Sequence, residues 1–286
     1  MLHARGDDVH VIVRPSTIAS RIGALPEGIT VHRADLADPS TASKTIESSR
    51  PEVVIHAAAS HGHATLSEQR LAAWRDDVIG TVVLLESLRR NLPDLFVHVG
   101  SSLVYRPSSA PLGEDAALGP ETLRGATKLA AATAVEQWSI ESGIPAVVVR
   151  PFSVYGPGQD ETRVIPVLLR SLASGSAFAV ASAESRRDFV HVDDVARCIV
   201  MAASQPASEV PVLNVGTGIE TSIKELIEMA ERLTGRAVVP ARDPHPPTPP
   251  SRPHWRADPS LASTVLGWTA DISLEQGMNM LWRVRP

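Results

Sequence analysis

The chain has 286 residues, which is long enough for a large core shared by two lobes. Its net charge of -5, with both signs interspersed, argues against the basic stripe of a nucleic-acid binder and the polybasic cluster of a membrane binder. The single cysteine, Cys198, excludes an intramolecular disulfide and a cysteine-based zinc cluster. No apolar run approaches the ~18 residues of a membrane span, and the first residues are too charged for a signal peptide. We therefore expect a cytoplasmic protein that binds neither nucleic acid nor membrane.

In the first half of the chain, short runs of β-branched residues alternate with amphipathic stretches. The expected strands are 9–13, 29–33, 53–57, 95–99 and 146–150, and the expected helices include 76–90 and 125–142. Apolar strands that alternate with helices are typical of a parallel sheet covered on both faces. The sequence therefore predicts an α/β fold with a doubly wound parallel sheet.

After Pro151 this alternation gives way to turns rich in glycine and proline. The elements expected here are a helix near 164–173, strands near 189–192 and 212–215, and a helix over 222–234 that Gly235 ends. The segment 244–253 holds six prolines in ten positions, which excludes a helix or a central strand. We expect an extended surface segment there.

Eight short segments follow one another in a fixed order along the chain. They are Asp35-Leu-Ala-Asp38, His56-Ala-Ala-Ala59, Val99-Gly-Ser-Ser-Leu-Val-Tyr105, Gly125-Ala-Thr-Lys-Leu-Ala130, Arg150-Pro-Phe-Ser-Val-Tyr-Gly-Pro-Gly-Gln159, Arg187-Asp-Phe-Val-His-Val-Asp-Asp194, Asn214-Val-Gly-Thr-Gly218 and Leu266-Gly-Trp268. Each segment alone is a weak signal, but together they resemble the extended short-chain dehydrogenase/reductase family over almost the whole chain. That family contains nucleotide-sugar epimerases, dehydratases and 4-ketoreductases.

The resemblance implies two lobes. A Rossmann-type NAD(P)-binding lobe is expected over 1–151, and a smaller C-terminal lobe over 152–286 is expected to hold a nucleoside-diphosphate sugar. Residues 188–216 are expected to return to the first lobe. Since relatives often dimerise through the helix that carries Lys128, the resemblance also implies a homodimer.

In the family a serine or threonine, a tyrosine and a lysine surround the nicotinamide. By resemblance Ser101 is the hydroxyl residue, and Lys128 is the lysine that holds the nicotinamide ribose. The family tyrosine stands four residues before the lysine, but here that position is Arg124, and neither Tyr105 nor Tyr155 has a lysine four residues later. Because arginine stays protonated, it cannot act as a base at neutral pH. Arg124 is then either a replacement in an inactive site or a cation that stabilises a substrate carbonyl oxygen.

The resemblance also implies cofactor contacts at the ends of the first strands. Asp35 and Leu36 are expected to contact the adenine, although they could also form a helix N-cap. Arg14 stands where NAD-preferring members carry an acid, so NADP is favoured over NAD, unless Arg14 is only a solvated loop residue. The remaining implied cofactor contacts are Ala57, Ala58, Ala59, Lys128 and Pro151.

The family begins with a strand and a Gly-x-x-Gly-x-x-Gly turn that binds the cofactor pyrophosphate. None of the 18 glycines has that spacing, and Met1–Gly6 resembles the end of the helix that follows the turn. We expect that the coding sequence upstream of Met1 supplies about 25–35 further residues, as a βα unit requires. The alternative is a shortened protein with a rearranged sheet.

Several positions bear on the substrate. Arg187 matches an arginine that clamps the substrate diphosphate, although a salt bridge with Asp188, Asp193 or Asp194 is the alternative. Ser102 and Leu103 stand where 4,6-dehydratases carry an Asp-Glu pair, so dehydration is disfavoured. The other expected substrate contacts are Ser153 and Arg163, which replace asparagines, and Val164.

The histidines do not indicate a metal. His61 and His63 have no cysteine and no evident carboxylate partner, so we expect a solvated loop there, and His56 and His191 lie in strand-like stretches as ordinary core or edge residues.

The function that the resemblance implies is an NADP-preferring nucleotide-sugar reductase or epimerase, with 4-ketoreduction first. The alternative is a non-catalytic protein of the same fold that binds a dinucleotide or a sugar nucleotide.

Overall fold

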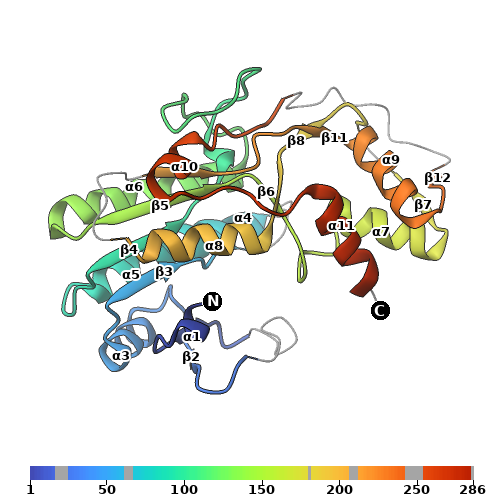
Figure 1. Cartoon of the computed structure of the whole chain (residues 1–286). Coiled ribbons are helices and arrows are strands. Elements are labelled where there is room, and N and C mark those ends of the chain that lie inside the picture. Colours follow the sequence, from blue (N-terminus) through green and yellow to red (C-terminus); the bar gives the residue numbers. More distant parts are fainter. Residues whose placement is uncertain (17–24, 61–66, 180–181, 206–211, 242–253, 285–286) are drawn as a thin grey trace. The chain divides into compact units, whose positions relative to one another are not determined.

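The computed structural model in Figure 1 describes residues 1–16, 25–60, 67–179, 182–205, 212–241 and 254–284. The chain divides into two units, each described here by itself. The first contains Met1–Tyr105, Leu118–Arg150 and Ile199–Leu213, and the second contains Arg106–Ala117, Pro151–Cys198 and Asn214–Pro286. The proline-rich segment 244–253 and the histidines at 61 and 63 lie outside the described residues.

The strands of the first unit form two sheets. A two-stranded sheet pairs β1 (His10–Val13) with β2 (Thr30–Arg33). A four-stranded sheet has the order β10-β5-β4-β3, which are Val212–Val215, Ala146–Pro151, Leu95–Val99 and Val53–His56. Because β4 and β5 are apolar and buried over almost their whole length, both faces of this sheet are covered. The predicted α/β fold with a doubly wound parallel sheet is confirmed.

The strands β1 and β3 both lie at the edge of a sheet. Among the described residues, β1 pairs only with β2, and β3 pairs only with β4. Both strands nevertheless pack against the same core cluster, since Ile12 of β1 and Val54 of β3 contact the group that includes Phe96 and Trp138.

The helices of the first unit cover these sheets. They are α1 (Leu2–Arg5), α3 (Pro39–Ser49), α4 (Ser67–Trp74), α5 (Gly80–Leu88) and α6 (Leu123–Ser142), with a 3-10 turn, η2 (Ser102–Val104). A π turn, η1 (Arg75–Ile79), joins α4 to α5, so the helix expected over 76–90 in fact begins at Ser67. Gly6 ends α1 in the left-handed conformation at φ 96°, as the sequence suggested.

The second unit consists of short strand pairs and helices around its own core. The strands are β6 (Ser153–Tyr155), β7 (Ala177–Phe178), β8 (Arg186–Arg187), β9 (Phe189–His191), β11 (Thr221–Ser222) and β12 (Val239–Pro240). The helices are α7 (Val164–Ser174), α8 (Val192–Ala203, which continues into the first unit), α9 (Ile223–Thr234), α10 (Ser260–Leu266) and α11 (Leu274–Val284). Leu168, Phe178, Leu226 and Met278 are central to this core. No helix within the described ranges is long and apolar enough to cross a membrane.

Candidate active site

Lys128 occupies a buried position on α6. Its Nζ donates a hydrogen bond of 2.9 Å to the carbonyl oxygen of Val99, at the carboxyl end of β4. The side chain is only 3% exposed, and this burial is the main reason that its pKa falls to about 8. The nearby Arg124 guanidinium lowers the pKa further, whereas the Asp77 carboxylate raises it.

Arg124 lies one helical turn before Lys128, as expected. Its Nη1 donates to the carbonyl oxygen of Ser60, which follows β3, over 3.2 Å. The guanidinium therefore supports the backbone at the end of β3 while it lies on the same helix face as the lysine.

A close approach of α6 to the 3-10 turn helps to hold this region together. A Cβ atom on Gly125 would lie 2.3 Å from the carbonyl oxygen of Leu103, so only glycine fits there without a shift of the backbone. Thr122 caps the helix by accepting a hydrogen bond from the Gly125 amide at 3.1 Å.

Ser101 begins the 3-10 turn directly after β4. Its Oγ accepts a hydrogen bond of 3.2 Å from the backbone N–H of Leu103, and its side chain is half-buried. Ser102 is buried at 2% exposure, whereas Leu103 is half-buried. Their expected substrate contacts stay predictions.

Neither tyrosine is free to replace the missing phenol. Tyr105 is fully buried, its hydroxyl accepts a hydrogen bond of 2.8 Å from Arg150, and that guanidinium lies 4.9 Å from the ring centre. Tyr155 is 1% exposed and donates to the carbonyl oxygen of Ser273, and burial raises its pKa.

His56 is a core histidine, as expected. Its Nε2 lies 2.8 Å from the hydroxyl of Thr81, which itself donates to the carbonyl oxygen of Asp77 at 2.6 Å. Because the Thr81 proton is used there, Nε2 must carry the proton of the imidazole. Burial lowers the pKa of His56 to about 3, so the ring is neutral.

The predicted adenosine contacts lie at the carboxyl ends of β1 and β2, where ligands bind in open α/β sheets. Arg14 forms an ion pair of 3.0 Å with Asp76, and Asp35 forms one with Arg75. Burial alone would raise the pKa of Asp35, but the hydrogen bonds from Arg75 and from the Ala37 amide lower it. Arg14 thus has an ion-pair partner, and its assignment to the cofactor stays a prediction.

The other expected cofactor residues differ in burial. Ala57 and Ala58 are exposed, Ala59 is half-buried, and Leu36 packs against the core cluster of the first unit. Pro151, which ends β5, is buried and belongs to the second unit.

The expected substrate residues Ser153, Arg163, Val164 and Arg187 lie in the second unit. Arg187 donates to the carbonyl oxygen of Arg186 over 2.6 Å. The Asp188 carboxylate, an alternative partner of Arg187, accepts from the backbone amides of Thr217, Gly218 and Ala257 at 2.8–3.0 Å. The Arg163 and Val164 pair forms the start of α7.

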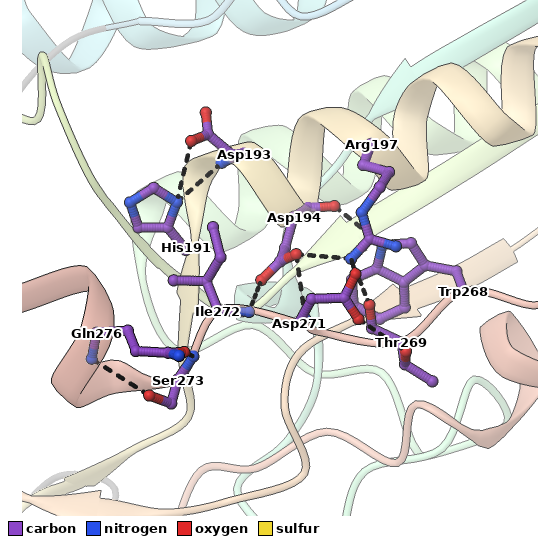
Figure 2. A network of polar contacts seen from close by, with 10 residues as sticks. All are labelled: His191, Asp193, Asp194, Arg197, Trp268, Thr269, Asp271, Ile272, Ser273 and Gln276. Atoms are coloured by element: carbon purple, nitrogen blue, oxygen red, sulfur yellow. Dashed lines mark hydrogen bonds and ion pairs between the residues drawn. The ribbon is translucent and has the colours of Figure 1, made fainter. Parts of the chain in front are cut away.

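Figure 2 shows the polar contacts at the end of the Arg187–Asp194 motif. Asp194 accepts hydrogen bonds from Arg197 at 2.7 Å and from the backbone N–H of Ile272 at 2.9 Å, and its carbonyl oxygen accepts from Trp268 Nε1 at 3.0 Å. Arg197 also pairs with Asp271 at 2.8 Å. Asp194 and Trp268, far apart in sequence, are thus held together within the second unit.

His191, which Figure 2 also draws, is fully buried, as expected of a core histidine. Within the described part of the chain, no three acidic, histidine or cysteine side chains form a metal site.

Comparison with known proteins shows the family. The model of the NAD dependent epimerase/dehydratase family matches residues 1–216. UDP-glucose 4-epimerase of Mycolicibacterium smegmatis is 30% identical over 252 residues, which cover 86% of this chain and 79% of that protein. GDP-6-deoxy-D-mannose reductase of Pseudomonas aeruginosa is 27% identical over 267 residues, which cover 87% of this chain and 85% of that protein.

Two solved structures have the same fold. The UDP-glucose 4-epimerase of Thermotoga maritima with UDP-glucose superposes with a TM-score of 0.88 at 25% identity, covering 99% of this chain and 92% of that one. MoeE5 in complex with UDP-glucose and NAD gives a TM-score of 0.86 at 28% identity, with the same coverage. The proteins similar to this chain are nucleotide-sugar epimerases and reductases. The chain belongs to the NAD-dependent epimerase/dehydratase family.

Proposed function

We propose that this protein is an NADPH-preferring reductase that converts a keto group at C4 of a nucleoside-diphosphate sugar to a hydroxyl. The observation that carries the proposal is the pair of cations on α6. Lys128 lies at the end of β4 and Arg124 at the end of β3, one helical turn apart. An ammonium can hold the ribose hydroxyls of a cofactor, and a guanidinium can stabilise negative charge on a carbonyl oxygen.

The residues at the strand ends fit part of an NAD(P) molecule. Lys128 suits the nicotinamide ribose, Asp35 suits the adenine end, and the small exposed side chains of Ala57 and Ala58 leave room beside β3. In the proposal a 2′-phosphate is a second partner of Arg14, beside Asp76. The 18 glycines of the chain do not provide the spacing of the pyrophosphate turn, so this part of the cofactor has no counterpart among them. Hydride exchange is the chemistry that a bound nicotinamide supplies.

The proton for the reduced oxygen needs a source other than tyrosine, because Tyr105 and Tyr155 are buried and hydrogen-bonded elsewhere. Arg124 keeps its proton, so its role in the proposal is to stabilise the oxygen electrostatically. We assign proton delivery to water held near Ser101, and we assign the substrate diphosphate to Arg187 of the second unit.

A non-catalytic protein that binds a dinucleotide or a sugar nucleotide is the second candidate. The hydrogen bond from Arg124 to the Ser60 carbonyl oxygen favours it, because a guanidinium used to support the backbone needs no role in chemistry.

The test measures NADPH oxidation with a panel of 4-keto-6-deoxy nucleotide sugars, after calorimetry has shown which ligands bind. Wild type, Arg124→Tyr and Lys128→Ala are compared, with the exposed Arg90→Ala as the matched control. We expect an active wild type and control, and a loss of about 10²–10³-fold in Arg124→Tyr, the usual cost of removing one such donor. A silent wild type that tyrosine activates indicates a decayed site. Binding without turnover in every variant supports the non-catalytic protein.

A further inference from the structure

Three consecutive residues of the π turn reach different segments of the first unit. The first two form ion pairs: Arg75 with Asp35 after β2, and Asp76 with Arg14 after β1. The third residue is Asp77. A π turn inserts one extra residue into a helix and is found often at functional sites.

The Asp77 carboxylate is buried, with 1% of the residue exposed. One oxygen accepts the backbone N–H of Ser60 at 2.6 Å, and the other accepts the hydroxyls of Ser60 at 3.1 Å and Thr127 at 2.6 Å. Among the described residues, its carboxylate therefore accepts hydrogen bonds from neutral groups alone. A buried charge of this kind is costly unless another charge compensates it.

Asp77 interacts electrostatically with the ammonium of Lys128. Lys128 follows Thr127 on α6 and donates to a neutral acceptor, the Val99 carbonyl oxygen. An anion and a cation are thus buried in the same region, each hydrogen-bonded to neutral partners, and their charges interact.

The other titratable groups around Lys128 cannot replace Asp77. Arg124 on α6 is positive and opposes the ammonium. His56 on β3 and His98 on β4 are both neutral, because burial lowers the pKa of His56 to about 3 and that of His98 well below its usual value. Of the groups that act on the lysine, Asp77 alone is negative.

We propose that Asp77 is a positioning residue: its carboxylate fixes Ser60, which follows β3, and Thr127, the neighbour of Lys128 on α6. Its carboxylate joins the end of β3 to the face of α6 that carries the lysine. The part of this inference that concerns cofactor binding rests on the proposed function, whereas the charge of the lysine does not.

The first experiment follows the 13Cε resonances of labelled lysines against pH. The chain has three lysines, of which Lys44 and Lys224 are exposed and serve as internal references. Lys128→Ala assigns the third resonance, whose pKa is expected at about 8. Asp77→Asn keeps the shape of the side chain and removes its charge.

In Asp77→Asn the Lys128 titration is expected to move down by at least about one pH unit, the usual effect of a nearby opposite charge. Arg124→Gln is expected to move it up, and Glu136→Gln, which removes an exposed carboxylate from the same helix, is expected to leave it unchanged. An unchanged Lys128 titration in Asp77→Asn overturns the proposal. If that variant does not fold, Asp77→Ser is titrated in its place, and an unchanged Lys128 pKa there overturns the proposal.

The second experiment measures the NADPH dissociation constant from pH 6 to pH 10. Wild-type binding is expected to weaken as the pH rises through the pKa of Lys128, and Asp77→Asn is expected to weaken at a lower pH. If the lysine titration shifts as expected but no variant binds NADPH, the proposed function is wrong and the assignment of Asp77 stands. If the wild type and Asp77→Asn bind NADPH with the same pH dependence, the positioning role is wrong.

Discussion

Replacing Lys128 by methionine is expected to change how the free energy of unfolding depends on pH. Methionine keeps most of the aliphatic length and removes the amine. The folded protein holds this amine with a pKa of about 8, whereas an unfolded chain holds it at the ordinary value of 10.5. Between these two values the unfolded state binds a proton that the folded state has released, so rising pH favours the folded state.

The size of the effect follows from the same two values. A difference of one pH unit corresponds to about 1.4 kcal/mol, so the stability of the wild type relative to Lys128→Met rises by about 3 kcal/mol in total from pH 8 to pH 10.5. Below pH 8 both states keep the proton and the difference is constant. The variant also loses the hydrogen bond to Val99, but that loss shifts the two curves apart without changing their relative slope.

The assay is urea unfolding followed by tryptophan fluorescence, at half-unit steps from pH 7 to pH 10.5. Cys198 and Tyr155 have raised pKa values and affect stability at high pH, but they are present in both proteins and cancel in the difference. Lys44→Met, which removes an exposed amine, is the matched control and should follow the wild type. Parallel curves for wild type and Lys128→Met between pH 8 and pH 10.5 would refute the reasoning, because they would mean that burial does not disfavour the ammonium.

Three further predictions concern the cofactor, the packing of α6 and the assembly. Calorimetry is expected to show tighter binding of NADPH than of NADH, and Arg14→Ala should abolish that difference; an equal affinity in the wild type contradicts the assignment. Gly125→Ala should destabilise the protein by about 1–3 kcal/mol in urea unfolding, because its Cβ would lie 2.3 Å from the Leu103 carbonyl oxygen; an unchanged midpoint would mean that α6 moves without cost. The protein is expected to be a homodimer by light scattering. Leu71 and Trp74 are exposed apolar residues of α4, so Leu71→Asp should give a monomer if α4 and α6 form the interface. A monomeric wild type contradicts the prediction of a homodimer.

The fold could be predicted from sequence because its signals are local and repeated. The apolar runs that became β4 and β5 are continuous, as buried parallel strands require. The start of α4 was missed because Ser67–Trp74 has a polar composition and little apolar periodicity. The π turn has no sequence signature of this kind, so the orientation of Asp77 could not be foreseen.

For the candidate site, the resemblance placed Lys128 and Arg124 one helical turn apart, and both lie on α6. Their roles stay predictions. Asp77, in contrast, depends on Ser60 and Thr127, which are distant from it in sequence and come together only in the folded chain. An aspartate in a helical stretch is ordinarily exposed to solvent. The sequence around Asp77 does not indicate that this carboxylate is buried.

The low burial of β1 and β2 has a consequence for ligand affinity. No residue of these two strands is fully buried, in contrast to the strands at the centre of the four-stranded sheet. The β1–β2 ladder is therefore expected to open in hydrogen exchange at a lower free energy than the rest of its unit. Arg14 directly follows β1 and Asp35 lies just beyond β2. A dinucleotide that contacts both residues can therefore bind only those molecules in which the β1–β2 ladder is formed. The measured dissociation constant then equals the intrinsic constant divided by the fraction of molecules in which the ladder is formed, so ligand binding is coupled to the local folding of the ladder.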